Sequence, residues 1–212
     1  MQALDRIDFS NNWLTLVFVF VLFLVAVLKS INQEKLFNYT RAFFLKGFIS
    51  KKTEEREAFF NVFNLILFFF SSIIYAIVIS LFVEYFLDFK LSFMLFTKIY
   101  SFVFLYLMVF IFLDKVIANL FEVKNEVSYL LSSKIAYLYN TSLFLFPVLV
   151  IINFSNSSTF VLFWIFTSLF LLSTLLLFIN NKNLIINKLF YFILYLCALE
   201  IAPLLIIYKI TV

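Results

Sequence analysis

The fold class is decided by an uninterrupted apolar run, residues 16–24, which reads Leu16-Val17-Phe18-Val19-Phe20-Val21-Leu22-Phe23-Leu24. A strand of a transmembrane β-barrel alternates apolar and polar residues over about ten positions. This run shows no such alternation, so it predicts a transmembrane helix.

The composition of the whole chain agrees with a lipid environment. Hydrophobic residues make up 65% of the 212 residues and charged residues 13%. Soluble domains usually contain about 45–50% apolar and about 25% charged residues. A soluble fold would have to expose large apolar patches, which soluble monomers rarely do.

Several kinds of functional site lack the residues they need. The sequence has no histidine, a single glycine at Gly47 and a single cysteine at Cys197. Catalytic triads with histidine, glycine-rich phosphate loops and cysteine metal clusters are therefore excluded. We expect no enzymatic activity, no cofactor and no metal ion. The net charge of +4 is better explained by membrane orientation than by nucleic-acid binding.

Six stretches are long enough to cross a hydrocarbon core of about 30 Å, which needs about 20 apolar residues per helix. They are residues 12–28, 59–83, 91–113, 135–152, 159–179 and 189–210. The sequence has no convincing inverted repeat and no linker rich in Pro, Gly or Ser. It therefore predicts one all-α membrane domain over residues 1–212, a polytopic bundle of about six transmembrane helices.

The distribution of Lys and Arg predicts the orientation of this bundle. Loops 29–58, 114–134 and 180–188 hold seven, three and two of the 16 basic residues. The other four are Arg6, Lys90, Lys98 and Lys209. Basic residues concentrate in cytoplasmic loops, so we expect these three loops in the cytoplasm and both termini on the opposite side.

Loop 29–58 mixes basic and aromatic residues. Positions 36, 37, 40, 43, 44 and 47 share one face of a helix, apolar except at Thr40 and Gly47. This pattern predicts an interfacial amphipathic helix with Phe43 and Phe44 towards the membrane; recognition of a lipid or phosphate head group is the alternative. The residues expected to contact the membrane surface or a partner are Lys35, Arg41, Phe43, Phe44, Lys46, Lys51 and Lys52.

The connection after the third span also has helical periodicity. Its apolar positions are Val116, Ile117, Leu120, Val123 and Val127. We expect the third helix to continue past the span and to form a ledge on which a partner protein can dock.

Glu200 is the one acidic residue near the middle of a predicted span. A charged side chain there costs about 2.5–3.5 kcal/mol on insertion scales. We expect Glu200 to face the bundle interior in its neutral form. Cys197, Glu200 and Pro203 share a helix face, and Pro203 leaves the Leu199 carbonyl without its helical donor. The site is either a proton, cation or head-group site, or a structural hydrogen bond beside a proline.

Two further features accompany this site. Asn61 and Asn64 open the second span three residues apart, and they either reach Glu200 and a polar cleft or bond between helices. Ala198 and Ala202 form a small-residue seam suited to close helix packing.

The carboxyl-terminal run Phe190-Tyr191-Phe192-Ile193-Leu194-Tyr195-Leu196-Cys197-Ala198-Leu199-Glu200-Ile201-Ala202-Pro203-Leu204-Leu205-Ile206-Ile207-Tyr208-Lys209 resembles the signature of an uncharacterised domain-of-unknown-function family. Its members are small polytopic inner-membrane proteins from Bacteroidota. Trp13-Leu14-Thr15 and Phe60-Asn61-Val62-Phe63-Asn64-Leu65 are similar to it too. The resemblance implies a bacterial inner membrane and places Cys197, Glu200 and Pro203 in the motif, but it implies no activity.

Three functions remain in view. The favoured hypothesis is a non-enzymatic scaffold, assembly or regulatory subunit of an inner-membrane complex, with membrane lipids and other subunits as partners and no nucleic acid. The alternatives are a small ion- or proton-coupled transporter that uses Glu200, and a lipid-linked enzyme or its accessory that acts on a phospholipid or polyprenyl phosphate.

Overall fold

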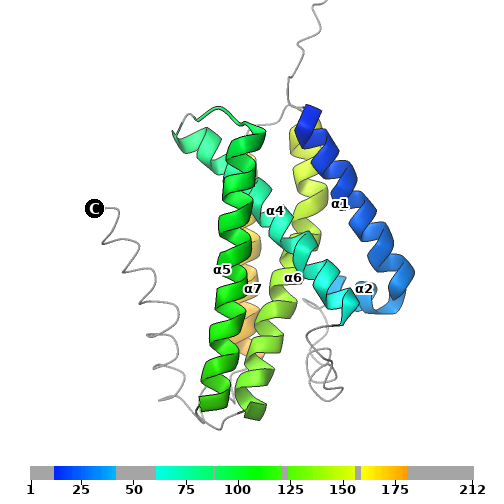
Figure 1. Cartoon of the computed structure of the whole chain (residues 1–212), viewed down its shortest axis with the longest axis vertical. Coiled ribbons are helices and arrows are strands. Elements are labelled where there is room, and N and C mark those ends of the chain that lie inside the picture. Colours follow the sequence, from blue (N-terminus) through cyan, green and yellow to red (C-terminus); the bar gives the residue numbers. More distant parts are fainter. Residues whose placement is uncertain (1–11, 42–60, 88, 121–123, 156–158, 181–212) are drawn as a thin grey trace, which may run out of the picture.

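The computed structural model describes residues 12–41, 61–87, 89–120, 124–155 and 159–180, which form helices without any strand (Figure 1). The helices are α1 (Asn12–Ile31), α2 (Gln33–Thr40), α4 (Val62–Leu87), α5 (Phe93–Leu120), α6 (Lys124–Phe154) and α7 (Thr159–Asn180). The expected all-helical fold is therefore confirmed for the described residues.

Five of these helices are long and apolar enough to cross a membrane. Their apolar segments are Trp13–Ile31, Val62–Leu87, Phe93–Phe112, Ser133–Phe154 and Thr159–Asn180, which match the first five predicted spans to within a few residues at each end. The sixth predicted span, residues 189–210, lies outside the described residues.

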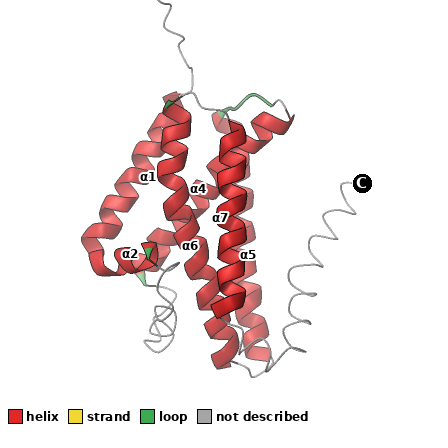
Figure 2. Ribbon diagram, turned by 180° about the vertical axis from the view of Figure 1, so that it is seen from behind, coloured by secondary structure: helices red, strands yellow, loops and turns green. Residues whose placement is uncertain are grey.

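Helices α4 and α6 form the centre of the bundle. Within the apolar segment of α4, 67% of the residues are buried, and within that of α6, 56% are. The shares are 22% for α1, 22% for α5 and 11% for α7. Figure 2 shows α7 and α5 running side by side in projection beside this pair, with α1 on the other side. The outer helices thus direct most of their apolar side chains away from the protein.

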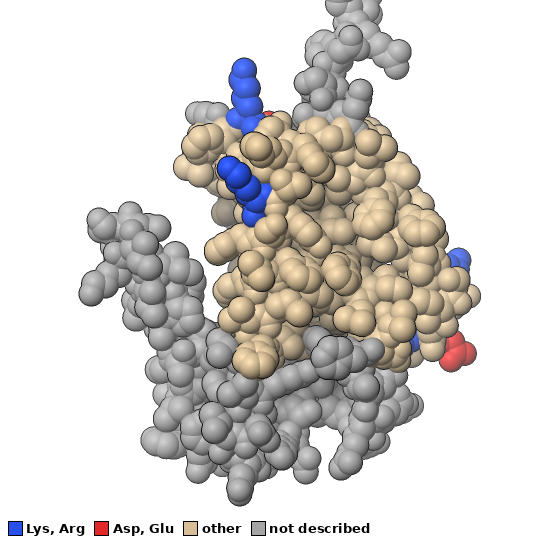
Figure 3. Space-filling model, viewed as in Figure 1, with Lys and Arg blue, Asp and Glu red and all other residues tan. Residues whose placement is uncertain are grey.

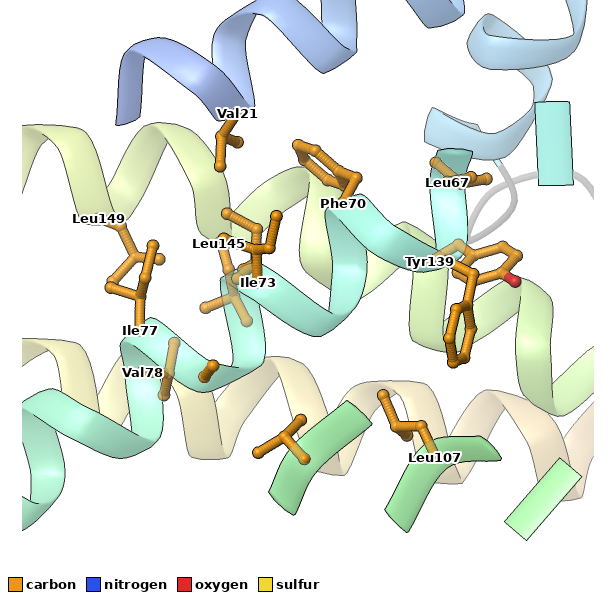
Figure 4. Close-up of a cluster of buried hydrophobic side chains, with 14 of the residues drawn as sticks. Val21, Leu67, Phe70, Ile73, Ile77, Val78, Leu107, Tyr139, Leu145 and Leu149 are labelled. Atoms are coloured by element: carbon orange, nitrogen blue, oxygen red, sulfur yellow. The ribbon is translucent and has the colours of Figure 1, made fainter. Parts of the chain in front are cut away.

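The core is built from branched and aromatic side chains of the central pair. Ile73 and Ile77 of α4 lie against Leu145 and Leu149 of α6 (Figure 4). Phe70 is fully buried, and its ring meets that of Phe146 edge-on at a centroid distance of 6.0 Å. Since lipid is as apolar as these side chains, close packing rather than the hydrophobic effect stabilises the contact between the helices.

The helices alternate in direction along the chain. Helices α1, α5 and α7 end at the end of the bundle from which α4 and α6 begin, the lower end in Figure 1. The three loops richest in Lys and Arg, 29–58, 114–134 and 180–188, therefore belong to this same end of the bundle in the order of the chain. On the face drawn in Figure 3, most of the described surface carries no charged side chain, as expected of a surface in contact with lipid.

Helix α5 continues past its apolar segment, as the sequence predicts. It extends from Phe112 to Leu120, and α6 begins at Lys124, nine residues before its own apolar segment starts at Ser133. At 1.5 Å per residue, these two extensions form a helical hairpin that projects about 12–14 Å beyond the apolar segments. Figure 1 shows α5 and α6 reaching beyond the ends of α1 and α4.

Candidate functional site

The chain turns sharply where α1 ends. Asn32 has an extended conformation, with φ of −158° and ψ of 97°, and its side-chain oxygen accepts a hydrogen bond from the Lys35 N–H at 2.9 Å. This N-cap ends one helix and starts the next with a single residue between them. As a result α2 leaves the axis of α1 and lies beside the start of α4 and the middle of α6 (Figure 1).

Tyr39, near the end of α2, is buried between the two central helices. Its side chain is fully buried, and its hydroxyl donates a long hydrogen bond of 3.5 Å to Asn64 Oδ1. Its ring stacks on Phe63 at 6.0 Å and meets the ring of Tyr139 edge-on at 5.9 Å. We call this cluster, together with Asn140, the Tyr39 junction.

Asn140 of α6 completes the junction from the other side. Its Nδ2 donates to the Tyr39 carbonyl and, at 3.1 Å, to the Thr40 carbonyl. The last carbonyls of any helix lack partners within the helix. Asn140 supplies the missing donor and so caps α2, although it lies one hundred positions after Thr40 in the chain. The junction therefore holds α2 against both central helices.

Two buried atoms of the junction have no hydrogen-bond partner among the described residues. They are the Tyr139 hydroxyl and Asn140 Oδ1. A buried polar atom left unsatisfied costs about 1–3 kcal/mol. Apolar residues of similar size would pack here without that cost, so the polarity of the junction is not explained by packing alone.

A neutral polar seam continues from the junction along α4 and α6. The Ser71 and Ser142 hydroxyls lie 2.8 Å apart, and the Tyr75 hydroxyl donates to the Leu138 carbonyl at 3.1 Å. Among the described residues, the buried polar side chains outside the aromatic residues are Asn, Ser or Thr. Such groups hydrogen-bond between membrane helices and fix their register.

Basic side chains at this end of the bundle lie over aromatic rings. Arg41 Cζ is 3.9 Å from the centroid of the Phe37 ring, and Lys35 Nζ is 5.1 Å from that of Phe63. On the extended hairpin side, Lys134 Nζ is 4.4 Å from the Phe110 centroid. Cations held over aromatic faces gain electrostatic attraction and lose conformational freedom.

The structure separates the two asparagines that the sequence placed together. Asn64 is buried in the Tyr39 junction, whereas Asn61 is exposed and its Oδ1 accepts from the Phe63 N–H at 3.4 Å at the start of α4. The described part of loop 29–58 contains the helix α2, Gln33–Thr40. The buried aromatic residue of α2 is Tyr39, whereas Phe37, which the sequence places on the apolar face, is 51% exposed.

Most of the other predicted site residues lie outside the described residues. They are Phe43, Phe44, Lys46, Lys51 and Lys52 of the first loop, and Cys197, Ala198, Glu200, Ala202 and Pro203 of the last predicted span. Whether Glu200 meets Asn61 or Asn64 therefore stays a prediction.

The sequence analysis missed Tyr39, Tyr139 and Asn140. A signal for Asn140 was present, since Asn140-Thr141-Ser142 is a polar triplet inside the fourth apolar span. Polar residues within a membrane helix face other helices more often than lipid. The triplet could therefore have identified α6 as a central helix.

Comparison with known proteins gives one match. The model of a family described as a domain of unknown function, DUF4271, matches residues 14–211. No curated protein and no solved structure matches the chain. The matched range agrees with the resemblance to an uncharacterised family that the sequence suggests along nearly its whole length.

Proposed function

The chain belongs to the DUF4271 family, and we propose that it is a non-enzymatic subunit of a protein complex in the inner membrane of a bacterium of the Bacteroidota. In this proposal it acts as a scaffold, assembly or regulatory component. Both termini face the periplasm, and the α5–α6 hairpin faces the cytoplasm.

The observation that carries the proposal is the hairpin itself. Helix α5 runs past its apolar segment to Leu120, and α6 begins at Lys124, before its own apolar segment. Val116, Ile117 and Leu120 recur at helical spacing in the extension of α5. An apolar stripe carried beyond the membrane suits a partner helix or a soluble subunit.

The neutral interior of the bundle supports the same proposal. The described buried polar side chains of α4 and α6 carry no charge, and those such as Ser71, Ser142 and Asn140 bond to one another, to carbonyls of their own helices or to α2. Ion-coupled carriers usually place ionisable residues along the substrate path. In the described residues, the seam between α4 and α6 is thus better suited to hold helices together.

Native purification of the tagged full chain tests the proposal. We expect other subunits to co-purify in fixed stoichiometry and to be lost in Ile117→Glu and Leu120→Glu. Ala118→Glu is the matched control, because it places the same charge on the opposite side of the same helix turn. The subunit proposal is wrong if no stoichiometric partner appears, or if all three variants lose it equally.

Substitutions of Glu200 distinguish the subunit proposal from the alternative of an ion- or proton-coupled carrier. A subunit with a structural Glu200 tolerates Glu200→Gln, which keeps the shape and most hydrogen bonds, and loses assembly with Glu200→Ala. A carrier that moves protons or cations loses function with Glu200→Gln while the protein still assembles. Retained growth and retained complex in the Gln variant therefore exclude the carrier.

The orientation has a separate test. Lys35→Cys in a Cys197→Ser background places the single thiol on α2. We expect a membrane-impermeant maleimide to label it only in inside-out vesicles, because the basic loop faces the cytoplasm. Labelling from the periplasmic side of intact spheroplasts would show that the topology is the opposite of the one proposed.

A further inference from the structure

The end of α1 and the length of α2 form a surface with a second role, independent of the proposed subunit function. We propose that this surface binds the head group of an anionic phospholipid through Arg41, with Lys29 and Lys35 as further positive charges on the same segment. The ligand is a lipid in the membrane rather than a free phosphate, since apolar side chains lie beside the basic ones.

The position of the surface along the membrane normal supports a lipid. Helix α1 is apolar from Trp13 to Ile31, and α2 begins two residues later at Gln33. Lys29 therefore lies in the last turn of a membrane span, and Lys35 and Arg41 follow it, at the depth of the head groups. Ile31 is 45% exposed and Phe37 51% exposed, so apolar side chains adjoin the same surface. This mixture is typical of interfacial helices.

The charge of the surface favours an anion. Lys29, Lys35 and Arg41 carry three positive charges, and the nearby acidic residue of α2 is Glu34 in its first turn. The surface therefore has a net positive charge within one short segment. Each basic residue near an anionic leaflet contributes to attraction that falls off within a Debye length.

The aromatic contacts prepare Arg41 for a phosphate. Its guanidinium lies 3.9 Å from the centroid of the Phe37 ring, which restricts the rotamers of a long side chain. A planar guanidinium offers paired N–H donors that match two phosphate oxygens. Because Arg41 is already restricted, binding a phosphate loses less conformational entropy than it does for a free side chain.

The Tyr39 junction holds the surface in place. Tyr39 is fully buried, and Asn140 bonds to the carbonyls of Tyr39 and Thr40, immediately before Arg41. The backbone that carries Arg41 is thus attached to α6. A lipid bound here has a fixed position relative to the central helices instead of a diffuse association with a basic loop.

Native mass spectrometry of the full-length protein in detergent tests the proposal. The probes are phosphatidylglycerol and phosphatidylcholine with identical acyl chains, titrated separately. We expect phosphatidylglycerol to bind more tightly. Lys29→Gln and Arg41→Gln should each weaken its binding about five-fold, equivalent to about 1 kcal/mol per charge.

The matched controls are Lys90→Gln and Lys98→Gln, which remove the same charge near the opposite end of the bundle, where α4 ends and α5 begins. They should leave phosphatidylglycerol binding unchanged. Equal weakening in the controls shows a net-charge effect and overturns the proposal, as does equal binding of the two lipids.

A competition arm separates a lipid from a soluble phosphate. Glycerol phosphate, added at the same concentration as the lipid, should not displace phosphatidylglycerol because it lacks the acyl chains that contact Ile31 and Phe37. Full displacement by glycerol phosphate would identify a soluble phosphate site and overturn the proposal for a lipid. Arg41→Lys, which keeps the charge but not the planar donors, should weaken binding less than Arg41→Gln.

Discussion

Helices α4 and α7 have similar composition but different surroundings. Both are long apolar helices, with hydroxyl residues in each. Yet 67% of the apolar segment of α4 is buried, compared with 11% for α7. The difference lies in what the polar side chains contact. Asn64 and Ser71 of α4 bond to α2 and α6 along the buried part of the helix. The Thr167, Ser168 and Thr174 hydroxyls bond to carbonyls of α7 itself, and α7 bonds to α6 through Asn180 at its last residue. Hydrogen bonds between helices, rather than apolar content, identify the central helix.

The largest effect should come from emptying the core of the central pair. Phe70 is fully buried, and Phe70→Ala should lower the free energy of unfolding by about 3–5 kcal/mol, because the cavity is only partly refilled. The measurement is unfolding in detergent micelles, followed by circular dichroism. Phe102→Ala on α5, where Phe102 is 66% exposed, is the control and should change stability by less than about 0.5 kcal/mol. Equal losses in the two variants would mean that α5 and α4 have similar surroundings.

The next largest effect should come from Asn140. Asn140→Ala removes the side-chain donor to the carbonyls of Tyr39 and Thr40, but it also removes the unpaired Asn140 Oδ1, so unfolding should become easier by about 1–2 kcal/mol. The same change should release α2, which limited proteolysis after residue 32 can detect. Ser168→Ala on the exposed face of α7 is the control. If α2 stays protected in Asn140→Ala, the cap is not what holds it.

The sequence predicts the helices of this fold better than their arrangement. Runs of about 20 apolar residues predict the five described spans, and the helical spacing of Val116, Ile117 and Leu120 predicts the extension of α5. Hydropathy does not show which helices lie at the centre, since lipid and protein interiors are equally apolar. The polar triplet at Asn140 carried that information.

The Tyr39 junction was harder to predict for a different reason. The predicted face of loop 29–58 includes positions 36, 37 and 40 and leaves out Tyr39. That face assumes a helix that continues to position 47, whereas α2 ends at Thr40 and its terminal carbonyls bond to Asn140. A contact between residues one hundred positions apart determines which side of a short helix is buried, and local periodicity does not contain it.

Removing the Tyr39 hydroxyl should have a smaller effect. Tyr39→Phe keeps the ring contacts with Phe63 and Tyr139 and loses the 3.5 Å hydrogen bond to Asn64. A bond of that length is weak, so we expect a loss of less than about 1 kcal/mol in the same unfolding measurement. Tyr39→Ala should lose about 3–5 kcal/mol, because it also removes the buried ring. A Phe variant as unstable as the Ala variant would assign the stabilisation to the hydroxyl.

The smallest effect should be the coupling between Ser71 and Ser142, which join α4 and α6 directly. Their hydroxyl oxygens lie 2.8 Å apart, and each also lies within hydrogen-bond distance of a carbonyl of its own helix, Leu67 for Ser71 and Tyr139 for Ser142. A hydroxyl has one proton to donate but can also accept, so the serine that donates across the interface gives up its bond to its own helix, while the serine that accepts keeps its own. The net gain from the interhelical bond is therefore small, and a double-mutant cycle with Ser71→Ala and Ser142→Ala should give a coupling of about 0.6 kcal/mol, the average for membrane helices. A coupling above about 1.7 kcal/mol would exceed the largest value expected for such pairs and would mean that the hydroxyls, more than the apolar side chains around them, hold the central pair together. A coupling of zero would mean that both protons go to their own helices. The serines would then act through their small size, which Ser71→Val should reveal as a loss of stability that Ser71→Ala does not share.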